Sequence, residues 1–312
     1  MKIAFMFPGQ GSQFVGMGRE LYGKYEIVRE YYDRASKRLD TDLTRIMFDG
    51  SREELTLTYN AQPAILTMSA AVARLVSSTY GIEPDLCMGH SVGEYSALTA
   101  ASVMAFEDAV YAVRKRGEAM QAAVRPGEGT MAAVIGMDEP LLQDLLLQAG
   151  AETGRTVEIA NYNSPGQIVI SGHTIAVDRA MDLLRAKGAR LVKKLEVSAP
   201  FHSSLMQPAV PVMEEVLHGM AFGKTRYPVV FNVDAAVHRD ESEIPGLLLR
   251  QLVSPVRWTD TITFALQQGV DTFIELGPGR VLTGLVKRIR GSARLFNVES
   301  PSTLEQLSVL VQ

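Results

Sequence analysis

A serine between two glycines, Gly89-x-Ser91-x-Gly93, is the strongest chemical signal in this sequence. The apolar residues 85–88 before it predict a buried strand, and the Ala- and Leu-rich residues 92–102 after it predict a helix. A Gly-x-Ser-x-Gly turn between strand and helix is typical of a nucleophile elbow. At a helix N-terminus, free N–H groups and the helix dipole would favour a developing oxyanion. The alternative is a plain turn in which Ser91 caps the helix.

A nucleophilic serine needs a base, and five histidines are available. His202 follows an expected strand, and sites in open α/β sheets form at the carboxyl ends of strands. The alternative for His202 is a hydrogen-bonded structural histidine. His90 is next to Ser91, but neighbours at an elbow point in different directions. The remaining three occur at an expected strand corner, a helix end and a polar loop: His173, His218 and His238.

The third member of a triad is not evident in this sequence. Esterases with such an elbow place an Asp or Glu between the serine and the histidine in chain order. Here the acids between Ser91 and His202 fall mostly on expected helices or in an expected small domain. A backbone carbonyl could hold the imidazole tautomer instead, which argues against an ordinary lipase or esterase. With a histidine base, we expect activity to fall as the pH drops through about 6.5.

Three cations occupy successive positions of an expected helix: Arg114, Lys115 and Arg116. Successive helix residues face different directions, so at least one can point inward. A buried arginine must pair with an anion, and its planar fork suits a carboxylate. The alternative, which the sequence alone favours, is three solvated charges.

Composition excludes several classes of protein. The 312 residues are 46% hydrophobic and 21% charged, and the net charge of −4 argues against a general nucleic-acid binder. The single cysteine, Cys87, excludes an internal disulfide and a Cys-rich metal site. Residues 1–7 are too short for a signal peptide, and no apolar run approaches the roughly 18 residues of a membrane span. The loop at 8–13 lacks the Gly-Lys-Ser/Thr of a phosphate loop. We therefore expect a cytoplasmic protein.

Strands alternating with helices predict an α/β fold with a mostly parallel sheet and helices on both faces. Among the helices, we expect one running from residues 16–18 to about 39 and one starting at residues 62–63 and ending near 80. A breaker cluster at 125–129 is followed by the order βαββαβ, which is the split ferredoxin-like unit. We therefore expect a large domain of residues 1–127 and 198–312, with a ferredoxin-like domain of residues 128–197 inserted into it.

With these residues identified, nearly the whole chain resembles the malonyl-CoA:acyl carrier protein transacylase family. Seven motifs carry the resemblance, in the family's order: Phe7-Pro-Gly-Gln-Gly-Ser-Gln13, Gly89-His-Ser-Val-Gly-Glu-Tyr-Ser96, Arg114-Lys-Arg-Gly-Glu118, Asn161-Tyr-Asn-Ser-Pro-Gly-Gln167, Pro200-Phe-His-Ser203, Arg250-Gln-Leu-Val-Ser-Pro-Val256 and Glu275-Leu-Gly-Pro-Gly279. The resemblance implies a hydrolase-like large domain with an inserted ferredoxin-like domain, in agreement with the order of elements.

The resemblance also implies roles for individual residues. It implies that Ser91 is the acylated nucleophile, that His202 is the general base and acid, and that Arg116 pairs with the malonate carboxylate. The backbone N–H groups of Gln10 and Val92 would form the oxyanion hole. Val92 stands where many relatives have leucine, a small change in a residue used through its backbone.

Further family features concern the cleft and the partners. A backbone carbonyl near Gln251 would orient the histidine, and His90 and Asn163 would line the cleft. The resemblance implies malonyl-CoA and an acyl carrier protein as substrates, no metal or redox cofactor, and a carrier from either fatty-acid or polyketide synthesis. We expect a monomer. The carrier of this family is acidic, so we expect it to meet a basic cluster near the cleft, although these could be solvated charges: Lys187, Arg190, Lys193, Lys194, Lys287 and Arg288.

Two other functions remain open at this point. A serine acyl hydrolase would use the same elbow with water, but it has no need of a buried arginine. A non-catalytic module that docks carrier proteins would not need Ser91 and His202 together.

Overall fold

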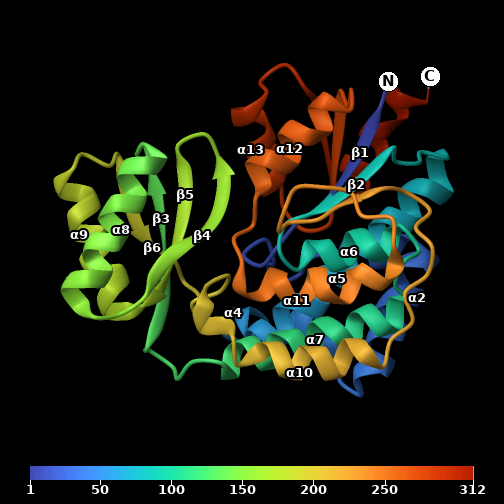
Figure 1. Ribbon diagram of the computed structural model, residues 1–312. Coiled ribbons are helices and arrows are strands. Elements are labelled where there is room, and N and C mark those ends of the chain that lie inside the picture. The colour runs from blue at the N-terminus through green and yellow to red at the C-terminus, as the bar shows by residue number, and fades with distance from the viewer. Residues whose placement is uncertain (312) are drawn as a thin grey trace.

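A computed structural model describes residues 1–311, which form two β-sheets with surrounding helices (Figure 1). The larger sheet has the order β7-β2-β1-β8-β9, and all its pairs are parallel. Its strands are β1 (Ile3–Phe7), β2 (Leu86–Gly89), β7 (Val229–Val230), β8 (Thr272–Leu276) and β9 (Arg294–Val298). This confirms the predicted α/β class with a mostly parallel main sheet.

Side-chain alternation along β1 explains why both faces of this sheet are covered. Phe5 and Phe7 pack into one buried cluster, while Ala4 and Met6 pack into another. The first face is covered by α2 (Glu26–Leu39), α5 (Thr58–Tyr80), α6 (Gly93–Ala100), α7 (Phe106–Ala122), α10 (Ala209–His218) and α11 (Ile244–Val253). The second face is covered by α12 (Trp258–Gln267) and α13 (Val281–Ile289). Buried parallel strands require helices on both sides, as observed.

Short elements complete the large part of the molecule. They are α1 (Arg19–Lys24), α3 (Leu43–Asp49), α4 (Arg52–Thr56), α14 (Pro301–Glu305) and the 3-10 turns Ser204–Met206, Glu241–Glu243 and Gln306–Leu310. The single helix expected up to residue 39 is therefore wrong, because Tyr25 is extended (φ −121°) and separates α1 from α2. The guanidinium of Arg29 donates to the carbonyls of Tyr22 and Gly23 beside this break.

The start of α5 also differs from the expectation that Pro63 lies in its first turn. The helix begins at Thr58, so Pro63 is inside it. A proline there leaves the carbonyl four residues earlier, that of Tyr59, without its helical donor. Arg114 of α7 donates to this carbonyl at 3.2 Å. A side chain distant in sequence thus supplies the bond that the proline removes.

The second sheet is antiparallel, with the order β4-β5-β3-β6. It contains β3 (Gly129–Ile135), β4 (Val157–Ser164), β5 (Gln167–His173) and β6 (Leu191–Lys194). Helices α8 (Glu139–Thr153) and α9 (Thr174–Ala186) cover one face and enclose a separate apolar cluster. The predicted order βαββαβ is confirmed. We propose the limits 128–197 for this domain, since all its strands and helices fall between them.

Strand β4 joins the small sheet to the large part of the molecule. The backbone N–H of Tyr162 donates to the carbonyl of Val256, and the N–H of Val256 donates to the carbonyl of Ala160, both at 2.9 Å. The hydroxyl of Thr259 donates to the carbonyl of Tyr162 at 3.1 Å. The connection between α11 and α12 therefore holds the small sheet against the carboxyl ends of the large one.

Candidate active site

The turn between β2 and α6 places Ser91 above the carboxyl end of the central strands. Ser91 has φ +53°, in the left-handed region that non-glycine residues rarely adopt. A Cβ on Gly89 would lie 2.0 Å from the carbonyl carbon of Gly93, and a Cβ on Gly93 would lie 2.1 Å from the carbonyl oxygen of Phe7. Only glycine fits at both positions, so the spacing of the motif follows from the sharpness of the turn.

His202 contacts Ser91, as the sequence predicts. The Nε2 atom of His202 lies 2.7 Å from Ser91 Oγ, and its Nδ1 atom lies 2.9 Å from the backbone carbonyl oxygen of Gln251 in α11. A carbonyl only accepts hydrogen bonds, so Nδ1 must carry the proton and Nε2 is left free to accept the hydroxyl proton. The carbonyl therefore performs the orienting role that a carboxylate has in a triad.

Burial changes the acid–base behaviour of His202. The imidazole is buried beside the guanidinium of Arg116, and desolvation followed by this positive charge lowers the pKa of His202 to about 3. The neutral base is therefore present throughout the neutral range. The expectation of an activity loss near pH 6.5 assumed a solvated imidazole, whereas the burial of His202 places its pKa lower.

Of the three successive cations on α7, only Arg116 points into the site. Its side chain is 1% exposed, whereas Arg114 and Lys115 both pair with the carboxylate of Glu118. The guanidinium of Arg116 donates to Ser91 Oγ at 3.2 Å and to the side-chain oxygens of Gln251 and Gln62. None of the ion pairs among residues 1–311 includes Arg116, and its Nε atom has no hydrogen-bond partner among them. The site thus holds a buried cation without a bonded anion.

The backbone N–H groups of Gln10 and Val92 both belong to segments next to the elbow. Gly9 packs so tightly that a Cβ there would be 2.6 Å from the carbonyl oxygen of His90, which places Gln10 at the edge of the elbow. Val92 is the N-cap of α6. No hydrogen bond within the described part of the chain uses the backbone N–H of Gln10 or Val92. Both groups are available to a developing oxyanion.

A cavity of about 130 Å³ lies over Ser91. Its walls include Gln10, His90, Arg116 and His202, and it adjoins a wider cavity of about 750 Å³ whose rim carries both basic and apolar side chains. The rim residues are Phe14, Val15, Arg52, Lys193 and Lys194. The narrow cavity has the size of a small organic group, and it continues into the wide one.

The remaining predicted residue, Asn163, belongs to β4 and contacts the elbow. Its side-chain oxygen lies 2.9 Å from Nε2 of His90, whose ring centroid is 5.7 Å from that of Trp258. His90 lines the cavity but Asn163 does not, so the expected place of Asn163 in the cleft wall is corrected: its side chain contacts the ring of His90 instead. The three other histidines lie away from the cavity: His173, His218 and His238.

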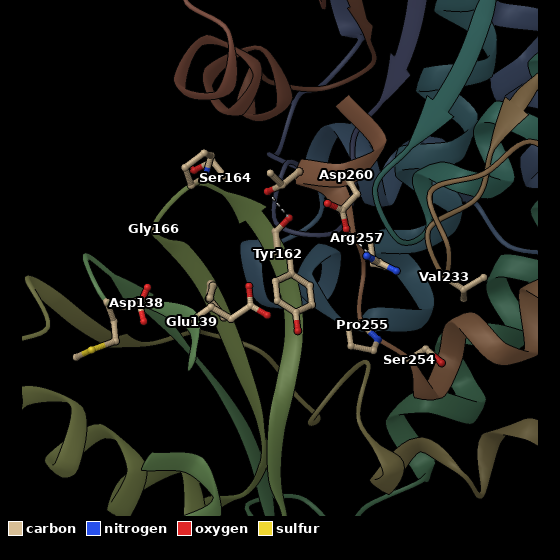
Figure 2. Close-up of a pocket in the computed structure, with 14 residues that line it drawn as sticks. Asp138, Glu139, Tyr162, Ser164, Gly166, Val233, Ser254, Pro255, Arg257 and Asp260 are labelled. Atoms are coloured by element: carbon tan, nitrogen blue, oxygen red, sulfur yellow. Dashed lines mark hydrogen bonds and ion pairs between the residues drawn. The ribbon is translucent and has the colours of Figure 1, made fainter. Parts of the chain in front are cut away.

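A different cavity, of about 640 Å³, lies on the opposite side of β4 (Figure 2). Tyr162 and Ser164 line it, while Asn161, on the alternate face of the same strand, lines the serine cavity. Figure 2 shows Arg257 and Asp260 on its other wall, where they form an ion pair with an N–O distance of 2.7 Å. None of the eight predicted site residues lines this larger cavity.

The described residues show neither a metal-binding cluster nor a membrane-spanning helix. Among residues 1–311, no group of three or more His, Cys, Asp or Glu side chains is placed to hold a metal ion. In the same residues, each helix is too short or too polar to span a lipid bilayer.

Comparison with known proteins identifies the family. The model of the acyl transferase domain matches residues 4–299. The malonyl CoA-acyl carrier protein transacylase of Bacillus subtilis is 49% identical over 304 residues, which are 97% of this chain and 95% of that protein. The chain belongs to the malonyl-CoA:acyl carrier protein transacylase family.

Solved structures of transacylases agree with this assignment. The transacylase from Coxiella burnetii is 40% identical and superimposes with a TM-score of 0.97, covering 100% of this chain and 98% of that one. A malonyl-transacylase in complex with the holo form of a type II polyketide synthase acyl-carrier protein is 42% identical, with a TM-score of 0.95 and 98% coverage of both chains. The hydrolase-like fold with a ferredoxin-like small domain is therefore that of the transacylases.

Three buried residues of this transacylase site were missed by the sequence analysis. Gln62 accepts a hydrogen bond from Arg116, and Asn232 and Glu94 lie beneath the elbow. Asn232 directly follows the apolar residues 229–231, and a polar side chain at the carboxyl end of a strand is a usable signal. The mostly apolar residues 229–233 alone would predict a strand that continues to Val233. It ends at Val230, because the chain then turns to bring Asn232 to the elbow.

Proposed function

We propose that this transacylase moves the malonyl group from malonyl-CoA to the phosphopantetheine thiol of an acyl carrier protein through a malonyl ester on Ser91. One observation carries the proposal. An orientated Ser91–His202 pair lines the same cavity as the buried, anion-free guanidinium of Arg116, which donates to the serine Oγ at 3.2 Å. That cavity fits an acyl group ending in a carboxylate.

The first half-reaction acylates the serine. Nε2 of His202 takes the proton of Ser91 Oγ as the oxygen attacks the thioester carbonyl. The tetrahedral oxyanion is stabilised by the backbone N–H groups of Gln10 and Val92. The carbon–sulfur bond then breaks, and His202 returns its proton to the departing CoA sulfur. The carbonyl of Gln251 holds the imidazole in place throughout.

The second half-reaction repeats these steps with another thiol. The phosphopantetheine thiol gives its proton to His202 and attacks the malonyl ester on Ser91. The same N–H groups hold the second oxyanion. The ester bond breaks and Ser91 Oγ recovers the proton from His202. No step needs a metal or redox cofactor.

A serine acyl hydrolase is the competing function, and Arg116 argues against it. A hydrolase gains nothing from burying a cation beside its nucleophile, whereas a malonyl group brings the anion that a buried arginine requires. The test is mass spectrometry after brief exposure to malonyl-CoA, with and without holo carrier protein. We expect a malonyl mass on the Ser91 peptide that the carrier removes. Rapid release of free malonate without carrier would favour the hydrolase.

Replacing Arg116 should change which acyl group is accepted. Removing one partner of a desolvated ion pair costs about 3–5 kcal/mol. Arg116→Ala should therefore lower kcat/KM for malonyl-CoA by about 10² to 10³ or more. Acetyl-CoA has no carboxylate, so its slow turnover should change little. Arg116→Lys should fall in between, because an ammonium cannot reproduce the guanidinium fork. The measurement is kcat/KM for both thioesters on all three proteins.

Arg114→Ala is the matched control for this substitution. Arg114 lies on the same helix but pairs with Glu118 and Asn60 away from the serine. It should leave the preference for malonyl-CoA over acetyl-CoA unchanged. An equal loss for both substrates in Arg116→Ala would show that Arg116 supports the fold instead of binding the carboxylate.

The basic cluster is proposed as the docking surface for the carrier protein. Lys193 and Lys194 lie on the rim of the wide cavity, through which the phosphopantetheine arm would reach Ser91. Lys194 also pairs with Asp178 at 2.6 Å, whereas Lys187 and Arg190 are near the ends of α9 and β6. Lys287 and Arg288 belong to the last turn of α13, and Arg288 contacts Gln167 of the small sheet.

Reversing the charge of Lys193 and Lys194 to Glu should weaken carrier binding and reduce its dependence on salt concentration. Acylation by malonyl-CoA should persist, since neither lysine contacts the nucleophile. The measurement compares KM for the carrier with the acylation rate at two salt concentrations. Lys37→Glu, on the exposed side of α2, is the control. Equal loss of both half-reactions would indicate damage to the cleft.

Compartment and oligomeric state are part of the same proposal. We propose that the protein acts as a monomer, because one chain supplies the nucleophile, the base, the orienting carbonyl and the anion-binding arginine. We also propose that it is located in the cytoplasm. The single cysteine, Cys87, is buried in β2, and one cysteine cannot form a disulfide within the chain.

A further inference from the structure

Asn232 is a completely buried side chain beneath the nucleophile elbow, and all its polar groups are used. Its Oδ1 atom accepts the backbone N–H of Ser91 at 2.8 Å, and its Nδ2 atom donates to the carbonyl of Gly89 at 2.7 Å. Its own N–H donates to Glu94 Oε2 at 2.6 Å, and its carbonyl accepts the N–H of Arg257 at 3.0 Å. One residue thus holds the backbone on both sides of the turn.

These contacts connect parts of the chain that are distant in sequence. Ser91 and Asn232 are 141 positions apart, and they meet because β2 and β7 are parallel neighbours. Gln251, whose carbonyl orients the base, also donates its side-chain N–H to the carbonyl of Ser91 at 3.0 Å. The peptide units around Ser91 are therefore fixed from the β7 side by Asn232 and from the α11 side by Gln251.

The contact with Ser91 N–H matters because the serine backbone is strained. A residue with φ near +53° keeps this conformation only when its surroundings over-determine it. Without Asn232, the Ser91 N–H would be a partly buried donor without a partner, and the turn could relax by rotating this peptide. Such a rotation would move Oγ away from Nε2 of His202.

Glu94 fixes Asn232 in turn. It is fully buried in the first turn of α6, and its burial raises the pKa of its carboxyl group to about 8. One carboxyl oxygen accepts the Asn232 N–H, while the other has no partner among residues 1–311. Glu94, on the helix that follows Ser91, therefore fixes Asn232, and Asn232 in turn holds the backbone of Ser91.

We propose that Asn232 is a positioning residue of the reaction: it acts through the backbone of Ser91 and keeps Oγ directed at His202 in both half-reactions. This inference rests on the proposed function. It assigns no contact between Asn232 and the substrate, since Asn232 lies below the turn and does not line the serine cavity.

The test is Asn232→Ala, studied by rapid-quench acylation with malonyl-CoA and by transfer to the carrier. We expect kcat of both half-reactions to fall about 10²-fold, the loss that a small misplacement of a reacting group can cause. KM for malonyl-CoA should stay within about threefold, because the contacts of Arg116 are intact. Asn232→Asp keeps an acceptor for the Ser91 N–H but loses the donor to Gly89, so it should recover part of the rate.

Two comparisons separate positioning from general stability. Asn60→Ala removes a buried asparagine with two side-chain hydrogen bonds outside the cavity, so it should lower the melting temperature without a comparable loss of kcat. In a Ser91→Ala background, adding Asn232→Ala should leave the Kd for malonyl-CoA unchanged within about threefold. Positioning of Oγ has no influence on binding when Oγ is absent.

The results that would overturn the inference are specific. A loss of kcat no larger than that of Asn60→Ala, a loss confined to KM, or weaker binding in the Ser91→Ala background would each reject positioning. If Asn232→Ala does not fold, Asn232→Asp takes its place: because Asp keeps the acceptor for the Ser91 N–H, a loss of kcat of about 10²-fold or more in a folded Asn232→Asp protein would reject the inference. These outcomes are distinct from failure of the proposed function, in which the wild-type chain itself acquires no malonyl group.

Discussion

Replacing Ser91 with alanine is expected to abolish malonyl transfer and leave no covalent adduct. The hydroxyl oxygen forms the ester in one half-reaction and leaves it in the other, so nothing else in the cavity can take its place. Loss of the Oγ atom should not unfold the chain, because the Ser91 backbone contacts with Asn232 and Gln251 remain. The measurement is mass spectrometry of the intact protein and of the peptide that contains residue 91, after exposure to malonyl-CoA.

Two nearby serines serve as controls for this result. Ser96 lies on α6, which follows the elbow, and is fully buried without a hydrogen-bond partner among the described residues. Ser203 follows the base and donates to the carbonyl of Pro200. Ser96→Ala and Ser203→Ala should both retain the malonyl adduct on Ser91. An adduct on either of these side chains in the Ser91→Ala protein would show that the nucleophile has been assigned wrongly.

The sequence was most informative where a local pattern has a steric cause. The spacing of Gly89 and Gly93 follows from backbone contacts below van der Waals distance, which no other residue tolerates at a turn of this kind. The alternating βαββαβ order likewise follows from short-range hydrophobic periodicity. Such features can be read before the structure is known, because they depend on residues within a few positions of one another.

Local patterns alone do not settle features that distant residues decide, and Arg116 was singled out only through the family resemblance. Nothing local distinguishes Arg116 from Arg114. The first faces Gln251, 135 positions away, and the second faces Glu118 on its own helix. Pro63 is tolerated inside α5 because Arg114 supplies a donor from another helix. Asn232 is recognised as part of the site only when β7 is placed beside β2. Tertiary contacts override local propensity in each case.

His202→Ala is expected to lower the rate of both half-reactions by about 10²–10⁴, the contribution of a general base. The loss should appear in kcat for malonyl-CoA and for the carrier thiol alike, because the same imidazole moves the proton in each. Rapid-quench measurement of acylation, followed by addition of holo carrier, separates the two rates. A loss in only one half-reaction would mean that another group acts as base in the other.

The pH dependence of the wild-type protein tests the same residue through its environment. Desolvation and the charge of Arg116 lower the pKa of His202 to about 3, so the neutral base persists as the pH falls below 6.5. The logarithm of kcat/KM, which reports the free protein, should therefore be nearly flat from pH 8 to about pH 5.

The complex with substrate should behave differently. Because a bound malonyl carboxylate offsets the charge of Arg116, the pKa of His202 should be higher in the complex than in the free protein. The acid limb of kcat should accordingly lie at higher pH than that of kcat/KM, and Arg116→Ala should bring the two limbs together. A limb of kcat/KM centred near 6.5 would show that His202 is solvated and that burial beside Arg116 does not set its pKa.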